Sequence, residues 1–290
     1  MQSNNPVWSR TQGFNGRGGN AQGNQTYAGN GQGYAGYGDP SQWGVGTPGA
    51  PGSPTHQEPG SRMTIDTVVQ KTGISVGVVI LAALATWILS PEITNTSGQE
   101  DLSGLFAAVT LGSLGAFALS MVNAFKKVVS PGLVLAFAVL EGVALGGISK
   151  LFNSMFEGNI VMGAVIGTFG AFAGTLAAYK FFNIQVSGKF RMFVMAAVFG
   201  MVGLSVMELV LGMFGSQIGL FGVSGLGMVT AVAGLVLGVF MLILDFDMVE
   251  KGIAAGLPER ESWRAAFGMT VSLVWIYTNL LRILAFFSQD

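Results

Sequence analysis

The stretch LDFDMVEKG, residues 244–252, decides how this chain folds. It ends an apolar run that begins near residue 225, and after the turn GLPERESW at residues 256–263 a second apolar run extends from 265 to 287. A helix needs about 20 residues to cross the hydrocarbon core of a bilayer, and both runs are long enough. The pattern therefore predicts two membrane-spanning helices joined by a charged turn. Ionisable residues inside such helices are costly in lipid and by default mark functional sites.

The composition of the whole chain is typical of a membrane protein. Of its 290 residues, 50% are hydrophobic and 10% are charged, whereas a soluble domain carries about 25% charged residues. The formal net charge of -1 gives no electrostatic attraction for nucleic acid, so we expect no nucleic-acid partner. The chain has no cysteine, which excludes disulfides, thiolate metal sites and cysteine nucleophiles.

Apolar runs of membrane-helix length recur from residue 72 onward. We place them near residues 72–90, 103–124, 131–149, 159–180, 191–211, 225–250 and 265–287. They predict an all-α, polytopic membrane protein, a seven-transmembrane-helix bundle at residues 63–290 with the lipid bilayer as its surroundings. Thr64 is the expected N-cap of a short amphipathic segment before the first span. Ser130-Pro131 is typical of a helix start, and the glycines between residues 212 and 227 favour a turn.

Residues 1–62 differ from the rest of the chain because they are rich in Gly, Asn, Gln, Ser and Pro. Such a segment cannot bury enough apolar surface to offset the entropy of ordering it, so we predict a disordered tail. It contains no apolar run typical of a cleavable signal peptide.

Lysine and arginine residues are distributed unequally between the two ends of the predicted spans. If the N-terminus is cytoplasmic, all but two of the 14 lie in inner segments, and the exceptions are Lys150 and Arg282. This bias follows the positive-inside rule and predicts a cytoplasmic tail. Seven spans then place the C-terminus outside, unless the last helix re-enters.

The predicted spans lack the side chains that intramembrane enzymes need. The single histidine, His56, lies outside them, so neither a serine-protease base nor a His-Glu-x-x-His metal site is available. An aspartyl protease needs two facing carboxylates, and the last span has Asn279 where a second acid would be sought. A retinal protein needs a lysine in that helix, which has only Arg282. We therefore expect neither enzyme activity nor a cofactor.

Five charged or amide side chains remain deep inside the spans: Glu141, Glu208, Asp245, Asn279 and Arg282. Their oxygens suit hard cations such as Ca²⁺, and sparse acids favour weak, releasable binding over a tightly bound metal. Glu141 lies about 15 Å into its span at helical rise, near the middle of the membrane. We select Glu141, Asp245 and Asn279 as residues of an ion pathway. Glu208 and Arg282 fit either permeation or a structural ion pair.

Asp245 and Asp247 cannot have the same role, because residues two apart on a helix point about 200° apart. Lys251 lies four residues after Asp247 and predicts a solvated salt bridge at the helix end. Asp245 has no such local partner and lies deeper, so it is the functional candidate of the two.

Polar and small residues form one stripe on the last predicted helix: Gly268, Ser272, Trp275, Asn279 and Arg282. Their three- and four-residue spacing places them on one face, which we expect to point into the bundle and to make this helix central. Glycines four residues apart predict close helix packing in lipid, as ordinary bundle contacts. These pairs are Gly142/Gly146, Gly163/Gly167, Gly170/Gly174 and Gly234/Gly238.

Several motifs resemble the Bax inhibitor family, specifically its bacterial YccA-like branch with long N-terminal tails. They are LDFDMVEKG at 244–252, P-x4-W-x-A-A-F-G at 258–268 and LVWIYTNLLR at 273–282. EGVALG at 141–146 is similar to the Glu-Gly-x-x-Leu-Gly motif of that family. SNNPV at 3–7 and MTID at 63–66 are similar to segments of its long-tailed members.

The resemblance implies a bacterial plasma-membrane protein in which six helices wrap the last one and Ca²⁺ leaks through the centre in a pH-dependent way. It also implies a latch of two carboxylates on the last two helices, where Asp245 matches the first and Asn279 replaces the second. Asp and Asn cannot share a proton as two acids do, so we expect the flux to vary little between roughly pH 6 and 8. Two alternatives stay open: an interaction protein that regulates a membrane protease or a stress response, and a bundle whose acids are only structural.

Overall fold

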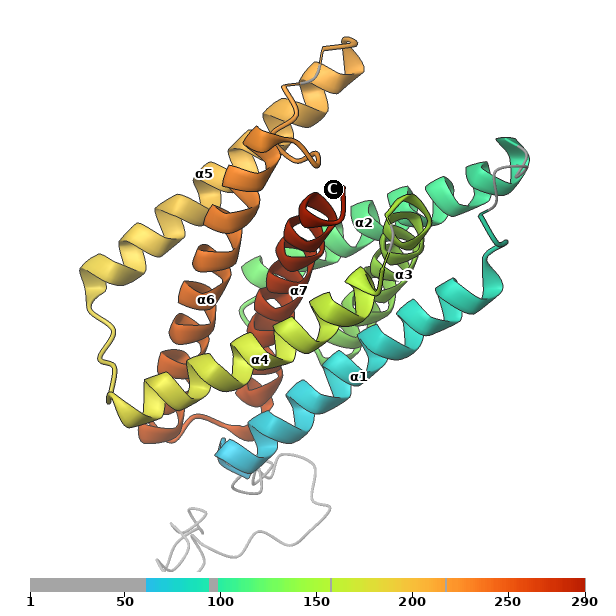
Figure 1. Ribbon diagram of the computed structural model, residues 1–290. Coiled ribbons are helices and arrows are strands. Elements are labelled where there is room, and N and C mark those ends of the chain that lie inside the picture. Colours follow the sequence, from blue (N-terminus) through green and yellow to red (C-terminus); the bar gives the residue numbers. More distant parts are fainter. Residues whose placement is uncertain (1–60, 94–98, 157, 217, 290) are drawn as a thin grey trace, which may run out of the picture. The chain divides into compact units, whose positions relative to one another are not determined.

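The computed structural model describes residues 61–93, 99–156, 158–216 and 218–289, and the predicted tail up to residue 60 lies outside this range. The helices are α1 (Ile65–Leu89), α2 (Gln99–Phe125), α3 (Pro131–Met155), α4 (Ile160–Phe181), α5 (Gly188–Met213), α6 (Gly225–Ala254), the short 3₁₀ helix η3 (Glu259–Glu261) and α7 (Ser262–Phe287) (Figure 1). All seven α-helices are long and apolar enough to cross a membrane. The predicted all-α fold with seven spans is therefore confirmed.

The helix starts follow the capping residues in the sequence. The Thr64 hydroxyl accepts from the Thr67 backbone N–H, and Thr67 reciprocates, which caps α1 as predicted. No break separates this cap from the first span, so the expected amphipathic segment and the span are one helix. Pro131 begins α3 as predicted, but α3 continues past Lys150, which was expected to follow it.

A glycine turn joins α5 to α6. Gly215 and Gly219 have φ angles of 75° and 80°, a left-handed conformation that side chains with a Cβ rarely adopt. The turn predicted from the glycine run is therefore confirmed, although Gly225 and Gly227 belong to the first turn of α6.

Loops on the side where α1 begins contact one another, and we call this the near side. The Glu259 backbone N–H, in the segment between α6 and α7, donates to the Ser61 carbonyl before α1, with an N···O distance of 2.7 Å. Arg264, in the first turn of α7, donates to the Lys127 carbonyl between α2 and α3 at 2.8 Å. These contacts place the α2–α3 and α6–α7 connections on the same side as the start of α1.

The opposite side, which we call the far side, joins the other helix ends. Lys150 in α3 donates to the Ser90 carbonyl after α1 at 2.6 Å. Arg282 in α7 donates to the Leu220 carbonyl between α5 and α6 at 2.9 Å. α7 runs continuously for 26 residues to this side, about 39 Å at helical rise, so the last helix spans the bundle and does not re-enter.

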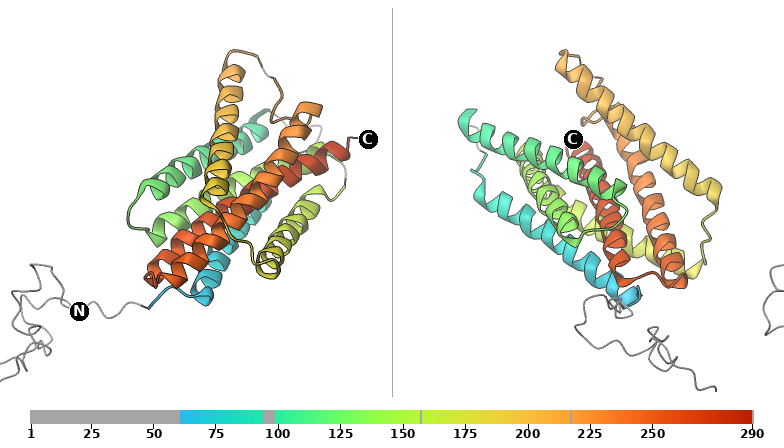
Figure 2. Two further views of the ribbon diagram at one scale, coloured as in Figure 1. Left: turned by 90° about the vertical axis from the view of Figure 1, so that its left-hand side faces the viewer. Right: turned by 180° about the vertical axis from the view of Figure 1, so that it is seen from behind.

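α7 lies at the centre of the bundle (Figures 1 and 2). It packs against α1, α3, α4 and α6, whereas α2 packs chiefly on α3, and α5 on α6. The predicted central position of the last helix is confirmed. Four helices rather than the six implied by the family resemblance surround it, because α2 and α5 form outer flanks on either side.

Three of the four predicted glycine pairs lie where helices meet: Gly142/Gly146 with α1, Gly163/Gly167 with α7 and Gly234/Gly238 with α7. In the first pair the backbones themselves approach closely, since a Cβ on Gly146 would lie 2.4 Å from the Ala83 carbonyl oxygen. Gly170 and Gly174 have nothing within 4 Å of such a Cβ, so this pair is not at an interface. Spacing alone did not distinguish these cases.

Candidate functional site

The polar stripe of α7 faces α6, and we call this contact the polar seam. Its α7 residues are Gly268, Ser272, Trp275, Asn279 and Arg282. Trp275 Nε1 donates to the Gly234 carbonyl at 2.8 Å, and Arg282 donates to the Gly227 carbonyl at 2.9 Å. Both acceptors are on α6, so the prediction that the stripe points into the bundle is confirmed.

Asp245 lies in the polar seam, close to two residues of α7. Its carboxylate Oδ2 accepts a hydrogen bond of 2.6 Å from Ser272 Oγ. A Cβ on Gly268 would lie 2.8 Å from Oδ1, so only glycine leaves room for the carboxylate there. Within the described residues, Asp245 forms no ion pair with a lysine or arginine. A half-buried acid inside a span is thus held by one hydroxyl group.

Asn279 lies in the same seam but does not meet Asp245. Its Nδ2 donates to the Trp275 carbonyl at 2.7 Å, and its Oδ1 would lie 2.4 Å from a Cβ on Gly234. Gly234 precedes Asp245 by about 16 Å along α6 at helical rise. The supposed contact between residues 245 and 279 is therefore not present, and Ser272 occupies the position facing Asp245.

The sequence contained a signal for the alignment of α6 with α7 that pairs Asp245 with Ser272. α6 and α7 are antiparallel neighbours joined by a short connection, so residues at equal distances from it face each other. Asp245 is nine residues before the end of α6 at Ala254, and Ser272 is ten residues after the start of α7 at Ser262. Asn279 lies about two turns further from the connection. Counting from the turn would have paired Asp245 with Ser272.

Glu141 lies on another side of α7. Four residues before it, Phe137 packs against Phe267 of α7 with ring centroids 5.0 Å apart, and eight residues after it, Ser149 contacts Tyr277 at 2.6 Å. This spacing places half-buried Glu141 on the face of α3 that is turned to α7. Phe267 and Tyr277 are not part of the polar seam, so the structure does not bring Glu141 and Asp245 together.

Glu208 and Arg282 do not form the ion pair considered from the sequence. Glu208 Oε1 accepts from the Gly219 backbone N–H at 2.7 Å, and Arg282 donates to the Leu220 carbonyl. The two charges thus bind adjacent backbone groups of the α5–α6 turn, which lies between them. Buried backbone groups in a turn need partners, and here the side chains supply them.

Asp247 has the predicted partner and one more. Lys251 Nζ lies 2.7 Å from Asp247 Oδ1, and Arg191 of α5 donates to Oδ2 at 2.8 Å. The expected solvation is wrong, since Asp247 is 4% exposed. The second cation comes from a different helix, which sequence spacing could not reveal. This cluster joins α5 to α6 on the near side.

The near-side turn also binds the last residues of the predicted tail, which was drawn to residue 62. Arg62 forms an isolated β-bridge with Pro258, next to the Ser61 contact described above. Lys71 of α1 forms an ion pair of 2.7 Å with Glu259. Ser61 and Arg62 therefore belong with the bundle. No local pattern predicts a pairing across almost 200 residues.

The chemistry available in the described residues is that of separate oxygen donors. No three His, Asp or Glu side chains come together there as metal ligands. Asp245 combines a carboxylate with a serine hydroxyl, and the rest of the polar seam offers carbonyls, an amide and a guanidinium group. This arrangement can bind and release a cation or a proton at one carboxylate.

Comparison with known protein families identifies the family of this chain. A family model described as Bax inhibitor 1 like matches residues 5–289. A search of the curated proteins found no match. The family match includes all seven helices, and the central last helix implied by the motifs of α6 and α7 is present in the structure. On this evidence the chain belongs to the Bax inhibitor 1 like family of multi-pass membrane proteins.

Proposed function

We propose that this protein is a leak pathway for Ca²⁺ and that Asp245 in the polar seam controls it. The observation that carries the proposal is an acid inside a span, with one hydroxyl as its partner on α7. Acids in such positions are rare because they are costly in lipid, and they usually serve transport. Oxygen donors suit Ca²⁺, and a single carboxylate releases it readily.

The hydrogen bond between Ser272 and Asp245 is the contact that a passing cation would have to replace. While this hydrogen bond is present, it joins α6 to α7 at this level, and Oδ2 of the Asp245 carboxylate accepts from Ser272. Protonation of Asp245 removes the charge that attracts a cation, so we expect the flux to fall as the pH falls. Because Ser272, and no second carboxylate of the described part of the chain, faces Asp245, the dependence should be weaker than in a two-acid latch.

Glu141 is the second acid of the proposed pathway. It faces α7 from α3, away from the polar seam, so it would bind a cation at a separate step. Its carboxylate has no hydrogen bond or ion pair within the described residues, which leaves its oxygens available. Half-burial and a free carboxylate support a role as a transient ligand.

We also propose that the near side is cytoplasmic, in a bacterial plasma membrane. Among the described cations, Lys126, Lys127, Lys189 and Arg260 lie on loops or helix starts of this side, as the positive-inside rule requires. The chain has no cysteine, so Lys127→Cys gives a single reporter. We expect an impermeant thiol reagent to label it only after the cells are opened. Labelling in intact cells would show that the near side faces outward.

Flux measurements with purified full-length protein in calcium-free liposomes test the leak. We expect external Ca²⁺ to enter, and Asp245→Asn and Glu141→Gln each to reduce the entry while leaving the thermal midpoint unchanged. Asp66→Asn is the matched control, since Asp66 is an exposed acid in the first turn of α1 and its loss should not change flux. No entry through the wild type would refute the leak, and equal entry through the wild type and both variants would count against a pathway that depends on these acids. The first of these results would favour the alternative, an interaction protein that regulates a membrane protease or a stress response.

A further inference from the structure

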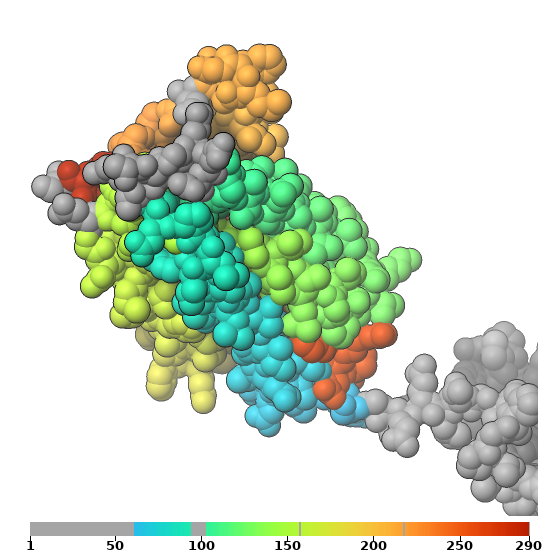
Figure 3. Space-filling model, turned by 90° about the vertical axis from the view of Figure 1, so that its right-hand side faces the viewer, coloured from blue at the N-terminus to red at the C-terminus, as the bar shows by residue number. Residues whose placement is uncertain are grey.

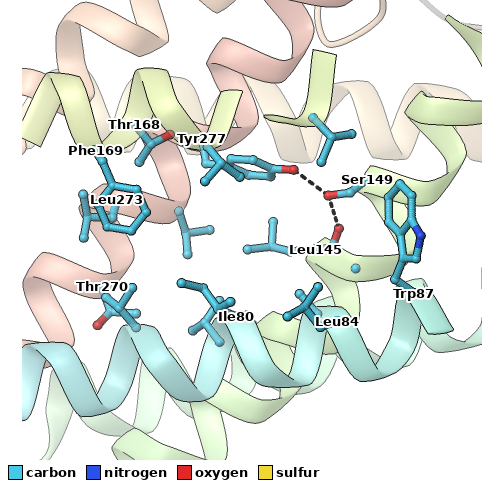
Figure 4. Close-up of a pocket in the computed structure, with 17 residues that line it drawn as sticks. Ile80, Leu84, Trp87, Leu145, Ser149, Thr168, Phe169, Thr270, Leu273 and Tyr277 are labelled. Carbon is cyan, nitrogen blue, oxygen red and sulfur yellow. Dashed lines mark hydrogen bonds between the residues drawn. The ribbon is translucent and has the colours of Figure 1, made fainter. Parts of the chain in front are cut away.

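An apolar groove lies beside α7 between α1 and α4 (Figure 4). Its volume is about 180 Å³. Its walls include Val76, Leu84 and Trp87 of α1 and Val165 and Phe169 of α4. α3 and α7 complete the lining, and none of the lining residues is charged. The groove contains neither Asp245 nor Glu141, so it is separate from the proposed ion pathway.

The hydroxyl groups around the groove are bonded within the protein. Thr168 and Thr270 each donate to the carbonyl four residues earlier at 2.7 Å. Ser149 Oγ donates to the Leu145 carbonyl at 2.6 Å and lies 2.6 Å from the Tyr277 hydroxyl, as Figure 4 shows. A buried water needs two to four polar partners, and an engineered apolar cavity of about 150 Å³ stays dry and binds benzene. The groove therefore suits an apolar ligand and excludes ions and water.

The groove opens sideways, toward the surroundings of the bundle. α1 and α4 lie next to each other on one face of the molecule (Figure 3), and each contributes one wall. Leu84 and Phe169, on opposite walls, are 52% and 48% exposed. Both belong to membrane spans, so the groove opens to lipid. From Val76 to Trp87 it follows α1 for about 16 Å at helical rise, which fits a linear chain.

One end of the groove has the features of a membrane interface. Trp87 lies there on the far side, and tryptophan is enriched at the level of lipid headgroups. Lys150 donates to the Trp87 and Ser90 carbonyls at 2.8 and 2.6 Å, which places a cation at the same level. Lys150 is 8% exposed and is bonded to these two carbonyls, so it marks the level of the headgroups and is not itself a phosphate site. An interfacial tryptophan followed by an apolar channel fits a phospholipid whose chain runs into the groove.

We propose that the groove between α1 and α4 holds one acyl chain of a phospholipid from the far-side leaflet. A chain in this position contacts Leu273 and Tyr277 of α7, which form the floor. Leu273 is 7% exposed, so bulk lipid on the outer surface of the bundle does not reach it freely. Occupancy of the groove does not require ion flux, and the two proposals can fail separately.

Photolabelling in vesicles tests this proposal. Full-length protein is reconstituted in phosphatidylcholine that contains a trace of phosphatidylcholine with a diazirine midway along one acyl chain. After irradiation, the modified residues are mapped by mass spectrometry. We expect adducts on Leu273 and Tyr277, and also on Met192 of α5, which is 73% exposed and serves as the internal reference for lipid contact.

Blocking variants distinguish the groove from general lipid contact. Val165→Trp and Leu84→Trp fill the groove from opposite walls, so each should lower the Leu273 and Tyr277 adducts several-fold relative to Met192. Ile166→Trp, at a 65% exposed position of α4 outside the groove, should leave the ratio unchanged. Two blocking variants on different helices protect the test against one that does not fold. The proposal is overturned if wild-type protein is labelled at Met192 but not at the floor, or if floor labelling persists in both blocked variants.

Discussion

α7 presents two unlike faces to its neighbours. Toward α6 it forms the polar seam, where serine, tryptophan and arginine side chains donate across to α6. Toward α1 and α4 it is apolar and leaves an open groove. Helices in lipid gain little from burying apolar surface, and they associate through packing and polar contacts. The seam therefore fixes the register of α7, whereas the apolar face tolerates a gap that lipid can fill.

The largest expected effect is on the far-side end of the seam. Arg282→Met removes the donor to the Leu220 and Gly227 carbonyls and to the Thr230 hydroxyl, each at 2.9 Å. Hydrogen bonds from charged groups are worth about 1.5–3 kcal/mol, so we expect a loss of about 3 kcal/mol in stability. Thermal unfolding in detergent measures it.

A second substitution at this position separates charge from shape. Arg282→Lys keeps the charge but cannot reach three acceptors with the same planar group, so its loss should be intermediate. If Arg282→Met and the wild type unfold at the same midpoint temperature, the α5–α6 turn does not depend on the polar seam for its stability.

The next prediction adds an acid to the seam. Ser272→Asp places a second carboxyl group opposite Asp245, whose present contact with Ser272 is 2.6 Å. Two acids this close share a proton at acid pH and repel when both are ionised. We expect the variant to be closed near pH 6 and open near pH 8, with about a tenfold difference in Ca²⁺ flux. Flux is measured in the same liposomes across this range.

Two matched variants test whether the pH switch requires a carboxyl group next to Asp245. Ser272→Asn has the shape of aspartate without its charge and should keep the weaker pH dependence of the wild type. Asn279→Asp adds an acid to the seam at Gly234, away from Asp245, and should not produce the switch. If Asn279→Asp rather than Ser272→Asp becomes strongly pH-dependent, the register of α6 and α7 in the structure is not that of the functioning protein.

The sequence predicted the elements of the fold well because each depends on nearby residues. The number and positions of the spans, the Thr64 cap and the glycine turn before α6 are local signals, and they agree with the structure, although α1 and α3 are longer than predicted. The stripe on α7 also predicted which face points inward, because helical spacing alone defines a face. These features required no knowledge of the partner helix.

Partners across helices were predicted less well. Asp245 was associated with Asn279 through the family pattern, although Ser272 faces it. Arg191 was missed as a partner of Asp247, because only the packing of α5 on α6 brings them together. Local periodicity says which way a side chain points, whereas its contact depends on the register of two helices.

A smaller effect is expected from glycines that touch the two faces of α7. A Cβ on Gly238 of α6 would lie 2.6 Å from Ile276 Cγ1 and 3.2 Å from the ring of Trp275, which is fixed by its hydrogen bond. A Cβ on Gly167 of α4 would lie 3.0 Å from a terminal methyl of Leu280, which can move. Overpacking costs about 1–3 kcal/mol, and alanine recovers about 1 kcal/mol of helix propensity.

We therefore expect Gly238→Ala to lose about 1 kcal/mol of stability and Gly167→Ala to change little. Thermal midpoints of the two single variants, measured in one detergent, make the comparison. A larger loss for Gly167→Ala would mean that the apolar face, and not the seam, is the tighter contact.

A loss smaller than that of Gly238→Ala is expected where, among the described residues, the apolar face has one cross-helix hydrogen bond to α3. Ser149 Oγ donates to the Leu145 carbonyl, so Tyr277 is the donor in the 2.6 Å contact between the two hydroxyls. Tyr277→Phe removes this donor and leaves the Ser149 proton bonded, so no buried group loses its only partner. Hydrogen bonds between membrane helices average about 0.6 kcal/mol, and we expect a loss of that size. Ser149→Ala should cost more, because it leaves the Tyr277 hydroxyl without an acceptor. Unfolding midpoints that rank Ser149→Ala below Tyr277→Phe, with both above Arg282→Met, would support the difference between the faces of α7. A loss for Tyr277→Phe as large as that for Arg282→Met would show that polar contacts fix both faces.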